Sequence, residues 1–386
     1  MVPRTLAEEV NRSLGSFPIL SITGPRQAGK TTLVRDLFPE YRYFNLEALD
    51  VRAIAEEDPR RFVEDHIKQG MVIDEAQRAP SLFSYLQTVV DADGTMGRVV
   101  FTGSQHFLLL ESVAQSLAGR VMLHHLLPFT ARELPHVLAQ PLDRVLLTGM
   151  YPPLHDRSIE PRLFYPTYSQ TYIERDVRLV RNIGNLSSFS RFLRLCAGRI
   201  GSLMNMSSLA VEAGIDHKTV RAWLSVLEAS FIIFFLQPYH RNFNKRLVKQ
   251  PKLYFYDTGL ACSLLGLDDE RHVSTHYLRG ALFENFVVSE LHKMQIHRSR
   301  RPGMYFWRDN SGTEVDLIVE RGADVSAVEM KSGSTYNDEF ARSLGRFERY
   351  SGLPPDRGHV VYGGDAGFHG RRIWSWRDLL ELDAIL

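Results

Sequence analysis

Short apolar runs that end in small or acidic residues recur through the first 130 residues of the chain. Three of them are residues 19–22, 71–73 and 99–101. Strands that are buried on both faces are apolar without interruption, as in a parallel sheet covered by helices. Residues 43–46 and 125–129 are interpreted as two further strands. The pattern predicts a doubly wound α/β domain.

The segment after the first run, residues 24–31, has the phosphate-binding pattern G-x-x-x-x-G-K-[ST]. Its glycines let successive backbone N–H groups turn toward phosphate oxygens, and the helix that begins near Lys30 adds its positive N-terminal end. We expect Lys30 to hold the β and γ phosphates of ATP and Thr31 to bind Mg²⁺. A glycine-rich turn with a chance lysine is the alternative. The residues expected to form the nucleotide site are Gly24, Pro25, Arg26, Gln27, Ala28, Gly29, Lys30, Thr31 and Thr32.

Two adjacent carboxylates, Asp74 and Glu75, end the second apolar run. Because ligands of parallel sheets gather at the carboxyl ends of the strands, we expect Asp74 to hold Mg²⁺ through water. Glu75 is expected to polarise the water that attacks the γ phosphate. The alternative is that the two acids only cap the next helix. Ser104 or Gln105, after the third run, lies near the γ phosphate if that strand runs between the other two.

Arg120 follows a glycine in the segment 116–120 and is a further candidate for contact with a phosphate. It would act within its own subunit or as an arginine finger into a neighbour. A solvated arginine at the end of a helix is the alternative, because sequence does not show how far the side chain reaches.

Composition limits the class of protein. With 386 residues, 44% of them hydrophobic and 24% charged, the chain is globular and long enough for two or three cores. It has two cysteines, Cys196 and Cys262, and neither a signal segment nor an apolar run of membrane-spanning length. We therefore expect a cytoplasmic protein without a membrane partner. The net charge of +1 neither requires nor excludes nucleic acid, so a DNA site has to come from local charge.

Helical periodicity marks a second region after the proline-rich turn at 151–153. Helices are predicted at 189–200, 207–213 and 217–228, followed by a strand-like run at 231–235. The last two helices have the glycine turn and the apolar spacing of a helix-turn-helix. The region is therefore predicted to be a winged-helix-like module.

The second helix of that module is predicted to present four polar side chains outward, those of His217, Lys218, Arg221 and Ser225. If the module reads DNA, these side chains enter the major groove and contact phosphates. The alternative is packing between domains, since one lysine and one arginine make a thin basic surface.

Acidic and apolar residues alternate in a third region. Residues 314–320 and 325–331 have the two-residue period of strands, and a turn at 321–323 joins them into a predicted hairpin. This period places Glu314 and Asp316 on one face of the first strand.

The hairpin would bring candidate metal ligands together. Asp316 and Glu329 are expected to hold Mg²⁺ or Mn²⁺, while Lys331 orients or activates water against a phosphodiester, as in metal-dependent nucleases. Glu284, on a predicted amphipathic helix, is a further candidate ligand. The alternative is an inactive sheet surface on which glutamate and lysine pair across solvent.

Taken together, these motifs resemble the bacterial and archaeal ATP-binding proteins that join an AAA-type ATPase domain to a C-terminal domain of unknown function, the DUF4143 family. The resemblance extends over nearly the whole chain. It does not identify a substrate. The matching segments are residues 24–32, 72–77, 102–104, 116–120, 171–177, 251–260, 280–285, 314–316 and 329–331.

The resemblance implies a winged-helix middle and ATP binding at four residues, Lys30, Thr31, Asp74 and Glu75. It also implies an end domain similar to restriction-endonuclease-like folds, with the nuclease pattern kept at Glu284, Asp316, Glu329 and Lys331. Val315 stands where the nominal nuclease motif has proline. That change removes a local bend but not the ligand.

Three domains are predicted. They are a P-loop AAA-type ATPase domain with a parallel sheet at residues 1–150, a helical and winged-helix-like domain at 151–240, and a restriction-endonuclease-like α/β domain at 241–386. The predicted function is ATP hydrolysis that remodels branched or otherwise structured DNA, by a homo-oligomer such as a hexameric ring. In the competing interpretation, the chain is a signalling or defence switch that binds a protein partner and has a catalytically silent end domain. In a third interpretation, the chain is a protein-binding regulator without DNA contact.

Overall fold

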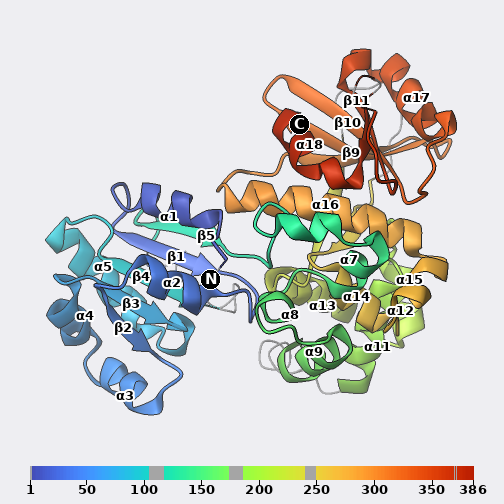
Figure 1. Cartoon of the computed structure of the whole chain (residues 1–386). Coiled ribbons are helices and arrows are strands. Elements are labelled where there is room, and N and C mark those ends of the chain that lie inside the picture. The colour runs from blue at the N-terminus through green and yellow to red at the C-terminus, as the bar shows by residue number, and fades with distance from the viewer. Residues whose placement is uncertain (1, 104–116, 174–185, 240–248, 369, 371) are drawn as a thin grey trace. The chain divides into compact units, whose positions relative to one another are not determined.

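The computed structural model describes residues 2–103, 117–173, 186–239, 249–368, 370 and 372–386, in two compact units (Figure 1). The first unit consists of Met1–Phe129, Ala229–Phe231 and Gln295–Arg300. The second consists of Thr130–Glu228, Ile232–Met294 and Arg301–Leu386. The phosphate-binding pattern and the acidic hairpin therefore belong to different units.

A five-stranded parallel sheet forms the centre of the first unit, in the order β2-β3-β4-β1-β5. Its strands are β1 (Ile19–Thr23), β2 (Arg42–Asn45), β3 (Met71–Asp74), β4 (Val99–Gly103) and β5 (Val121–His125). Every residue of β1, β3 and β4 is buried, and β4 lies between β3 and β1. The predicted doubly wound α/β fold is confirmed.

Helices cover both faces of this sheet. Those on one face are α1 (Leu6–Ser13) and α2 (Lys30–Leu37), and those on the other are α3 (Leu49–Glu57), α4 (Pro59–Ile67) and α5 (Ser81–Asp93). In β3, Val72 packs into the cluster with α1 and α2, whereas Met71 and Ile73 pack into the cluster with α3, α4 and α5. Burial on both faces explains why these strands are apolar without a two-residue period.

The last strand of the sheet differs from the prediction. It is β5, Val121–His125, and the predicted strand at 125–129 was wrong. Leu126 and Leu127 are fully buried although they follow the strand, and this burial accounts for their apolar character. A short apolar run alone does not distinguish a strand from a buried connection.

The second unit combines helices with a seven-stranded sheet in the order β12-β11-β10-β9-β8-β6-β7. Its helices are α7 (Leu142–Thr148), α8 (Pro152–Asp156), α9 (Pro161–Tyr168), α11 (Leu186–Ala197), α12 (Met206–Ala213), α13 (His217–Ala229), α14 (Thr258–Leu264), α15 (Glu270–Thr275), α16 (Arg279–His297), α17 (Arg342–Ser351) and α18 (Leu379–Ile385). The last residue of α13 and the last three residues of α16 belong to the first unit. Its strands are β6 (Ile233–Pro238), β7 (Lys252–Phe255), β8 (Met304–Arg308), β9 (Glu314–Arg321), β10 (Asp324–Lys331), β11 (Gly358–Tyr362) and β12 (Ile373–Ser375). In the described part of the chain, none of the helices has the length and hydropathy of a membrane span.

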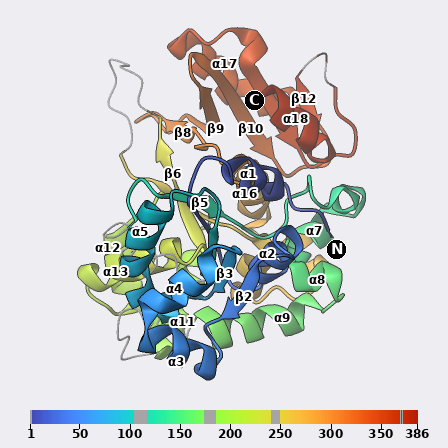
Figure 2. The ribbon, with the colours of Figure 1, turned by 90° about the vertical axis from the view of Figure 1, so that its left-hand side faces the viewer.

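The helices predicted for the winged-helix-like module are present as α11, α12 and α13, and the strand-like run after them is β6. Strand β6 pairs antiparallel with β7 and parallel with β8, so the strands of this module and the C-terminal strands share one sheet. Helix α17 lies beside β9 and β10 (Figure 2). Its Leu344 and Phe347 pack in one cluster with Ile318 of β9, which gives this end of the sheet its core.

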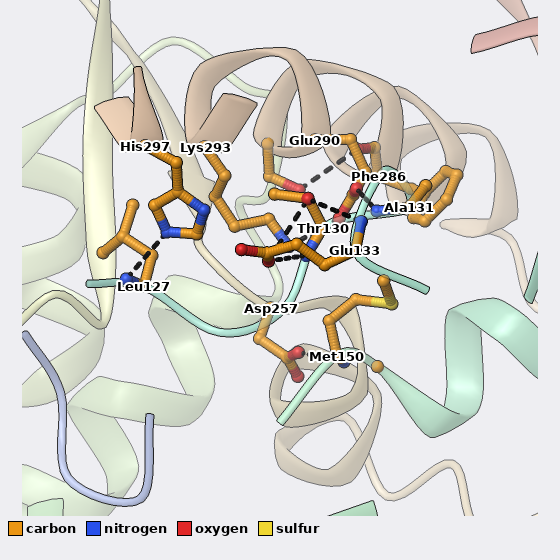
Figure 3. Close-up of polar contacts among 12 residues, drawn as sticks. Leu127, Thr130, Ala131, Glu133, Met150, Asp257, Phe286, Glu290, Lys293 and His297 are labelled. Atoms are coloured by element: carbon orange, nitrogen blue, oxygen red, sulfur yellow. Dashed lines mark hydrogen bonds and ion pairs between the residues drawn. The ribbon is translucent and has the colours of Figure 1, made fainter. Parts of the chain in front are cut away.

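Buried acids fix the chain path at the start of the second unit. The N–H of Ala131 donates to Oε2 of Glu290 on α16 at 2.6 Å, and Nζ of Lys293 lies 2.5 Å from Oε1 of the same residue (Figure 3). Asp257 lies immediately before α14, and its Oδ2 accepts a hydrogen bond from the N–H of Met150 at 2.7 Å. A buried carboxylate is costly unless it has such partners, so these contacts hold the connecting segments against the two helices.

Candidate functional site

Two glycines shape the loop between β1 and α2. Gly24 has a φ of +155°, and a Cβ atom there would lie 2.0 Å from the carbonyl oxygen of Leu126. Gly29, directly before α2, has a φ of +94°, in the left-handed region that favours glycine. The two glycines of the phosphate-binding pattern are therefore required by the backbone path of this loop.

Lys30 is the first residue of α2, and its side chain folds back over the loop. Its Nζ donates to the carbonyl oxygens of Gly24 at 3.0 Å and Pro25 at 2.9 Å, and the residue is 6% exposed. Burial lowers the pKa of Lys30, while Glu75 and Asp74 act in the opposite direction. An ammonium group at the N-terminal end of a helix is a combination that binds phosphate.

Arg4, from outside the motif, holds the middle of the loop. Its Nη1 donates to the carbonyl oxygen of Ala28 and its Nη2 to that of Leu127, both at 2.7 Å. Gln27 is exposed with a φ of +60°, and Thr32 is exposed on α2. The partners of Arg4 are 24 and 123 residues away along the chain, so no local pattern marked this arginine.

Asp74 ends β3 and is held by three hydroxyl groups. Oγ1 of Thr31 donates to its Oδ2 at 2.8 Å, and the hydroxyls of Tyr43 and Thr102 also donate to its carboxylate. Burial, and next the hydrogen bond to Asp74, raise the pKa of Tyr43 to about 12, so this hydroxyl keeps its proton. The structure thus brings together the two residues predicted to bind Mg²⁺, and their oxygen atoms are the ligand type that Mg²⁺ prefers.

Glu75 leaves the strand in a left-handed conformation, with a φ of +59°. Nε2 of Gln77 donates to its Oε2 at 2.6 Å, and its side chain makes no capping hydrogen bond to the short helix Ala76–Arg78. A residue other than glycine is strained in this conformation, and such strain gathers at functional positions. The alternative role of a simple helix cap therefore does not describe Glu75.

Of the other residues predicted for this site, Arg120 is not brought to the loop. Ser104 and Gln105 lie outside the described residues. Arg120 directly precedes β5, whose first residue pairs with Ile19 at the start of β1, whereas the loop follows the opposite end of β1. Its guanidinium donates to the carboxylate of Asp91 at 2.6 and 2.8 Å. A role of Arg120 in a neighbouring subunit stays a prediction.

The predicted hairpin is present in the second unit as β9 and β10, which pair antiparallel. Nζ of Lys331 donates to Oε1 of Glu329 at 2.5 Å and lies 3.8 Å from Oδ2 of Asp316. The N–H of Met330 donates to the same oxygen of Asp316 at 2.8 Å. The three predicted residues therefore converge, and they line a cavity of about 450 Å³.

Glu284, on α16, pairs with Lys252, a residue that was not among those predicted for the site. Nζ of Lys252 donates to Oε1 of Glu284 at 2.9 Å and also pairs with the carboxylate of Glu314. The hydroxyl of Tyr254 donates to the same oxygen of Glu284 at 2.5 Å. Lys252 is 2% exposed. A lysine directly before the apolar residues of β7 was the available signal, since a buried lysine needs an acidic partner.

The carboxylates of this cluster oppose one another's ionisation. Burial, and next repulsion by Asp316, raise the pKa of Glu329 to about 8. Burial also raises the pKa of Glu284 to about 7, with Lys252 acting against it and Asp316 adding to it. Burial alone would lower the pKa of Lys331, but Asp316 and Glu329 outweigh it and the pKa is raised.

The Mg²⁺ or Mn²⁺ site predicted at Asp316 and Glu329 stays a prediction, and Lys331 lies against both acids. Across the described ranges, no group of three or more His, Cys, Asp or Glu side chains is arranged to hold a metal ion. Lysines engage two of the acids of this cluster, Lys252 at Glu284 and Lys331 at Glu329.

Replacing Glu329 by glutamine should stabilise the protein increasingly as the pH rises from 5 to 9. The pKa of the native carboxyl is raised to about 8 from an ordinary value of 4.5. The native state therefore keeps a proton that the unfolded chain releases, and the resulting stability is complete below pH 4.5 and lost as the pH rises through 8. Glutamine stays neutral, so we expect a gain of roughly 1–3 kcal/mol at pH 9 and almost none at pH 5.

Thermal unfolding of both proteins across this pH range measures the effect. The same substitution at the exposed Glu339 is the control and should follow the wild type at every pH. A difference between Glu329→Gln and the wild type that does not change with pH would contradict the raised pKa.

Three family models match successive parts of the chain. A model described as an AAA domain matches residues 16–135. Two models of domains of unknown function, DUF8612 and DUF4143, match residues 139–271 and 279–379. The first match covers the sheet and loop of the first unit, and the last covers the acidic hairpin.

Two mycobacterial proteins are similar to this chain over most of its length. They are the uncharacterized proteins Rv2008c of Mycobacterium tuberculosis and Mb2031c of Mycobacterium bovis. Each is 32% identical to this chain over 337 residues, which cover 86% of this chain and 74% of the relative.

Solved structures also match. The Walker-type ATPase Paby2304 of Pyrococcus abyssi is 15% identical, with a TM-score of 0.44 over 67% of this chain and 94% of that one. The RuvB Holliday junction branch migration motor of Thermotoga maritima is 15% identical, with a TM-score of 0.26 over 59% of this chain and 88% of that one. From the family models and the mycobacterial relatives, together with its own sheet and loop, the chain belongs to the family of AAA-type P-loop ATPases that carry a C-terminal DUF4143 domain.

Proposed function

We propose that this protein hydrolyses ATP at the loop of its first unit, with Mg²⁺ as cofactor. The observation that carries the proposal is the hydrogen bond from Thr31 to Asp74, because it joins the start of α2 to the acidic end of β3 beside Lys30. Lys30 and the N-terminal end of α2 would bind the phosphates, and Thr31 and Asp74 would hold the metal. Bound Mg²⁺ would neutralise charge on the phosphates.

Glu75 is the proposed general base. Its left-handed backbone turns the residue away from the line of β3, and the Gln77 amide holds one of its carboxylate oxygens. A carboxylate fixed in this way would orient the attacking water and accept its proton.

We further propose that ATP hydrolysis is used to remodel DNA. In support, His217, Lys218, Arg221 and Ser225 are all exposed on α13, as predicted. In a helix-turn-helix the second helix reads the major groove, so these side chains occupy the positions that would contact DNA. A homo-oligomer, such as a hexameric ring, is part of the proposal because Arg120 needs a neighbouring copy to reach a phosphate.

A second candidate function is a nucleotide-controlled switch that binds a protein partner and has a catalytically silent end domain. It is favoured by the ion pair of Lys252 with Glu284, which occupies a carboxylate that the nuclease pattern assigns to a metal. Cutting of DNA by the second unit has correspondingly less support. The response of ATP turnover to DNA separates the two candidates.

Lys30→Ala should lower ATP turnover by roughly a hundredfold or more, because the variant lacks the ammonium that neutralises charge developing on the phosphates. ATP turnover, followed by phosphate release, and the melting temperature are measured on the same preparation. The melting temperature should stay close to that of the wild type. Lys68→Ala, at an exposed lysine of the same unit, is the matched control. Turnover that survives in the folded Lys30→Ala protein would refute the loop assignment.

Glu75→Gln should keep ATP affinity and lose turnover, since the amide cannot accept a proton from water. Affinity is measured with a fluorescent ATP analogue and turnover by phosphate release. If affinity falls together with turnover, Glu75 supports binding of the nucleotide and is not the group that activates water.

DNA should stimulate ATP turnover, and the combined Lys218→Ala and Arg221→Ala variant should lose much of that stimulation. Turnover is measured with single-stranded, duplex and four-way DNA at two salt concentrations. Removal of two phosphate contacts should reduce the slope of log affinity against log salt by about 2. Arg60→Ala with Arg61→Ala, two exposed arginines on α4, is the matched control. Nucleotide-dependent assembly without any response to DNA would favour the switch.

A further inference from the structure

A buried lysine lies among the acids of the second unit. Lys252 is the first residue of β7, and its Nζ donates to Oε1 of Glu284 at 2.9 Å. The same ammonium group pairs with Oε1 of Glu314. On the other side of Glu314, Nη1 of Arg308 donates to Oε2 at 3.0 Å. The hydroxyl of Tyr254 completes the surroundings of Glu284 at 2.5 Å. Both acids are therefore already engaged by donors of the chain itself.

The other two acids of the cluster have a different cation. Lys331 donates to Glu329 at 2.5 Å and lies 3.8 Å from Asp316. All four carboxylates thus have a lysine partner, and the two lysines come from different strands, β7 and β10. Lys252 pairs with Glu284 and Glu314, and Lys331 with Glu329 and Asp316, and no three acids among the described residues are arranged to hold a metal ion.

An ammonium group and a divalent cation meet the same electrostatic need at buried acids. Carboxylates in a low-dielectric interior require a nearby positive charge and hydrogen-bond donors or coordination for their oxygens. Lys252 supplies the charge and N–H donors, and at 2% exposure it is sealed from solvent as a bound cation would be. A metal ion at Glu284 would therefore have to displace this side chain.

We propose that the ammonium group of Lys252 takes the place of a divalent cation between Glu284 and Glu314, so that the carboxylate site of the second unit is complete without a metal ion. The inference is independent of ATP hydrolysis in the first unit. It assigns to Lys252 a role that the nuclease pattern gives to Mg²⁺ or Mn²⁺. Removal of the ammonium group should then create a metal site that the wild-type protein lacks.

The test uses the full chain without nucleotide and counts bound Mn²⁺ by electron paramagnetic resonance. Lys252→Met keeps the length of the side chain and removes its charge, and it should bind one more Mn²⁺ than the wild type. Adding Glu284→Gln to this variant should remove the extra ion. Mn²⁺ should also raise the melting temperature of Lys252→Met more than that of the wild type, because a ligand that binds the native state stabilises it.

Lys293→Met is the matched control, because Lys293 is equally buried and pairs with Glu290 on α16. It should gain no Mn²⁺. Any Mn²⁺ bound at the loop of the first unit is common to all these proteins and cancels in the comparison.

Two outcomes would overturn the proposal. One is a folded Lys252→Met protein that binds no additional Mn²⁺. The other is loss of a bound Mn²⁺ when Asp316→Asn or Glu284→Gln is introduced alone, since the wild type would then hold a metal at this site. The second comparison does not depend on whether Lys252→Met folds, and equal Mn²⁺ binding by the wild type and both single variants supports the proposal.

Discussion

The carboxylate of Asp74 is the constraint on which the first unit depends. It is buried at the end of β3 and accepts hydrogen bonds from Thr31 of α2, Tyr43 of β2 and Thr102 of β4. A buried carboxylate is costly unless it is satisfied in this way, so the helix and both neighbouring strands must take positions that bring their hydroxyls to β3. The sheet order β2-β3-β4 thereby forms one wall of the proposed nucleotide site.

The second unit holds its buried acids with cations instead of hydroxyls. Glu284 and Glu314 pair with Lys252, while Asp316 and Glu329 pair with Lys331. Hydroxyl donors leave the negative charge of a carboxylate in place, where a metal can use it, whereas a nearby ammonium group offsets that charge. Buried carboxylates are therefore free to bind a cofactor in the proposal for the first unit, whereas those of the second unit are paired with lysines.

The segments that match separate family models are physically joined in the second unit. Lys252 lies within residues 139–271, whereas Glu284 and Glu314 lie within residues 279–379. Strand β6 of the first segment also pairs with β8 of the second. Because an ion pair and a sheet edge cross this boundary, the end domain is not electrostatically complete on its own.

The amino-acid sequence by itself determined the elements whose signals are local. The glycines and the lysine of the loop, the apolar strands covered on both faces, the helix-turn-helix and the acidic hairpin all follow from residues a few positions apart, and the structure contains each of them. Tertiary structure alone decided which groups meet. It placed Arg120 at the end of the strands that is opposite the loop. It also paired Tyr43 with Asp74, 31 residues apart in the sequence, and Lys252 with Glu284, 32 residues apart. The physical reason is that the partner of a buried charge depends on which strands become neighbours, and the order of strands in a sheet is not contained in the periodicity of any one of them.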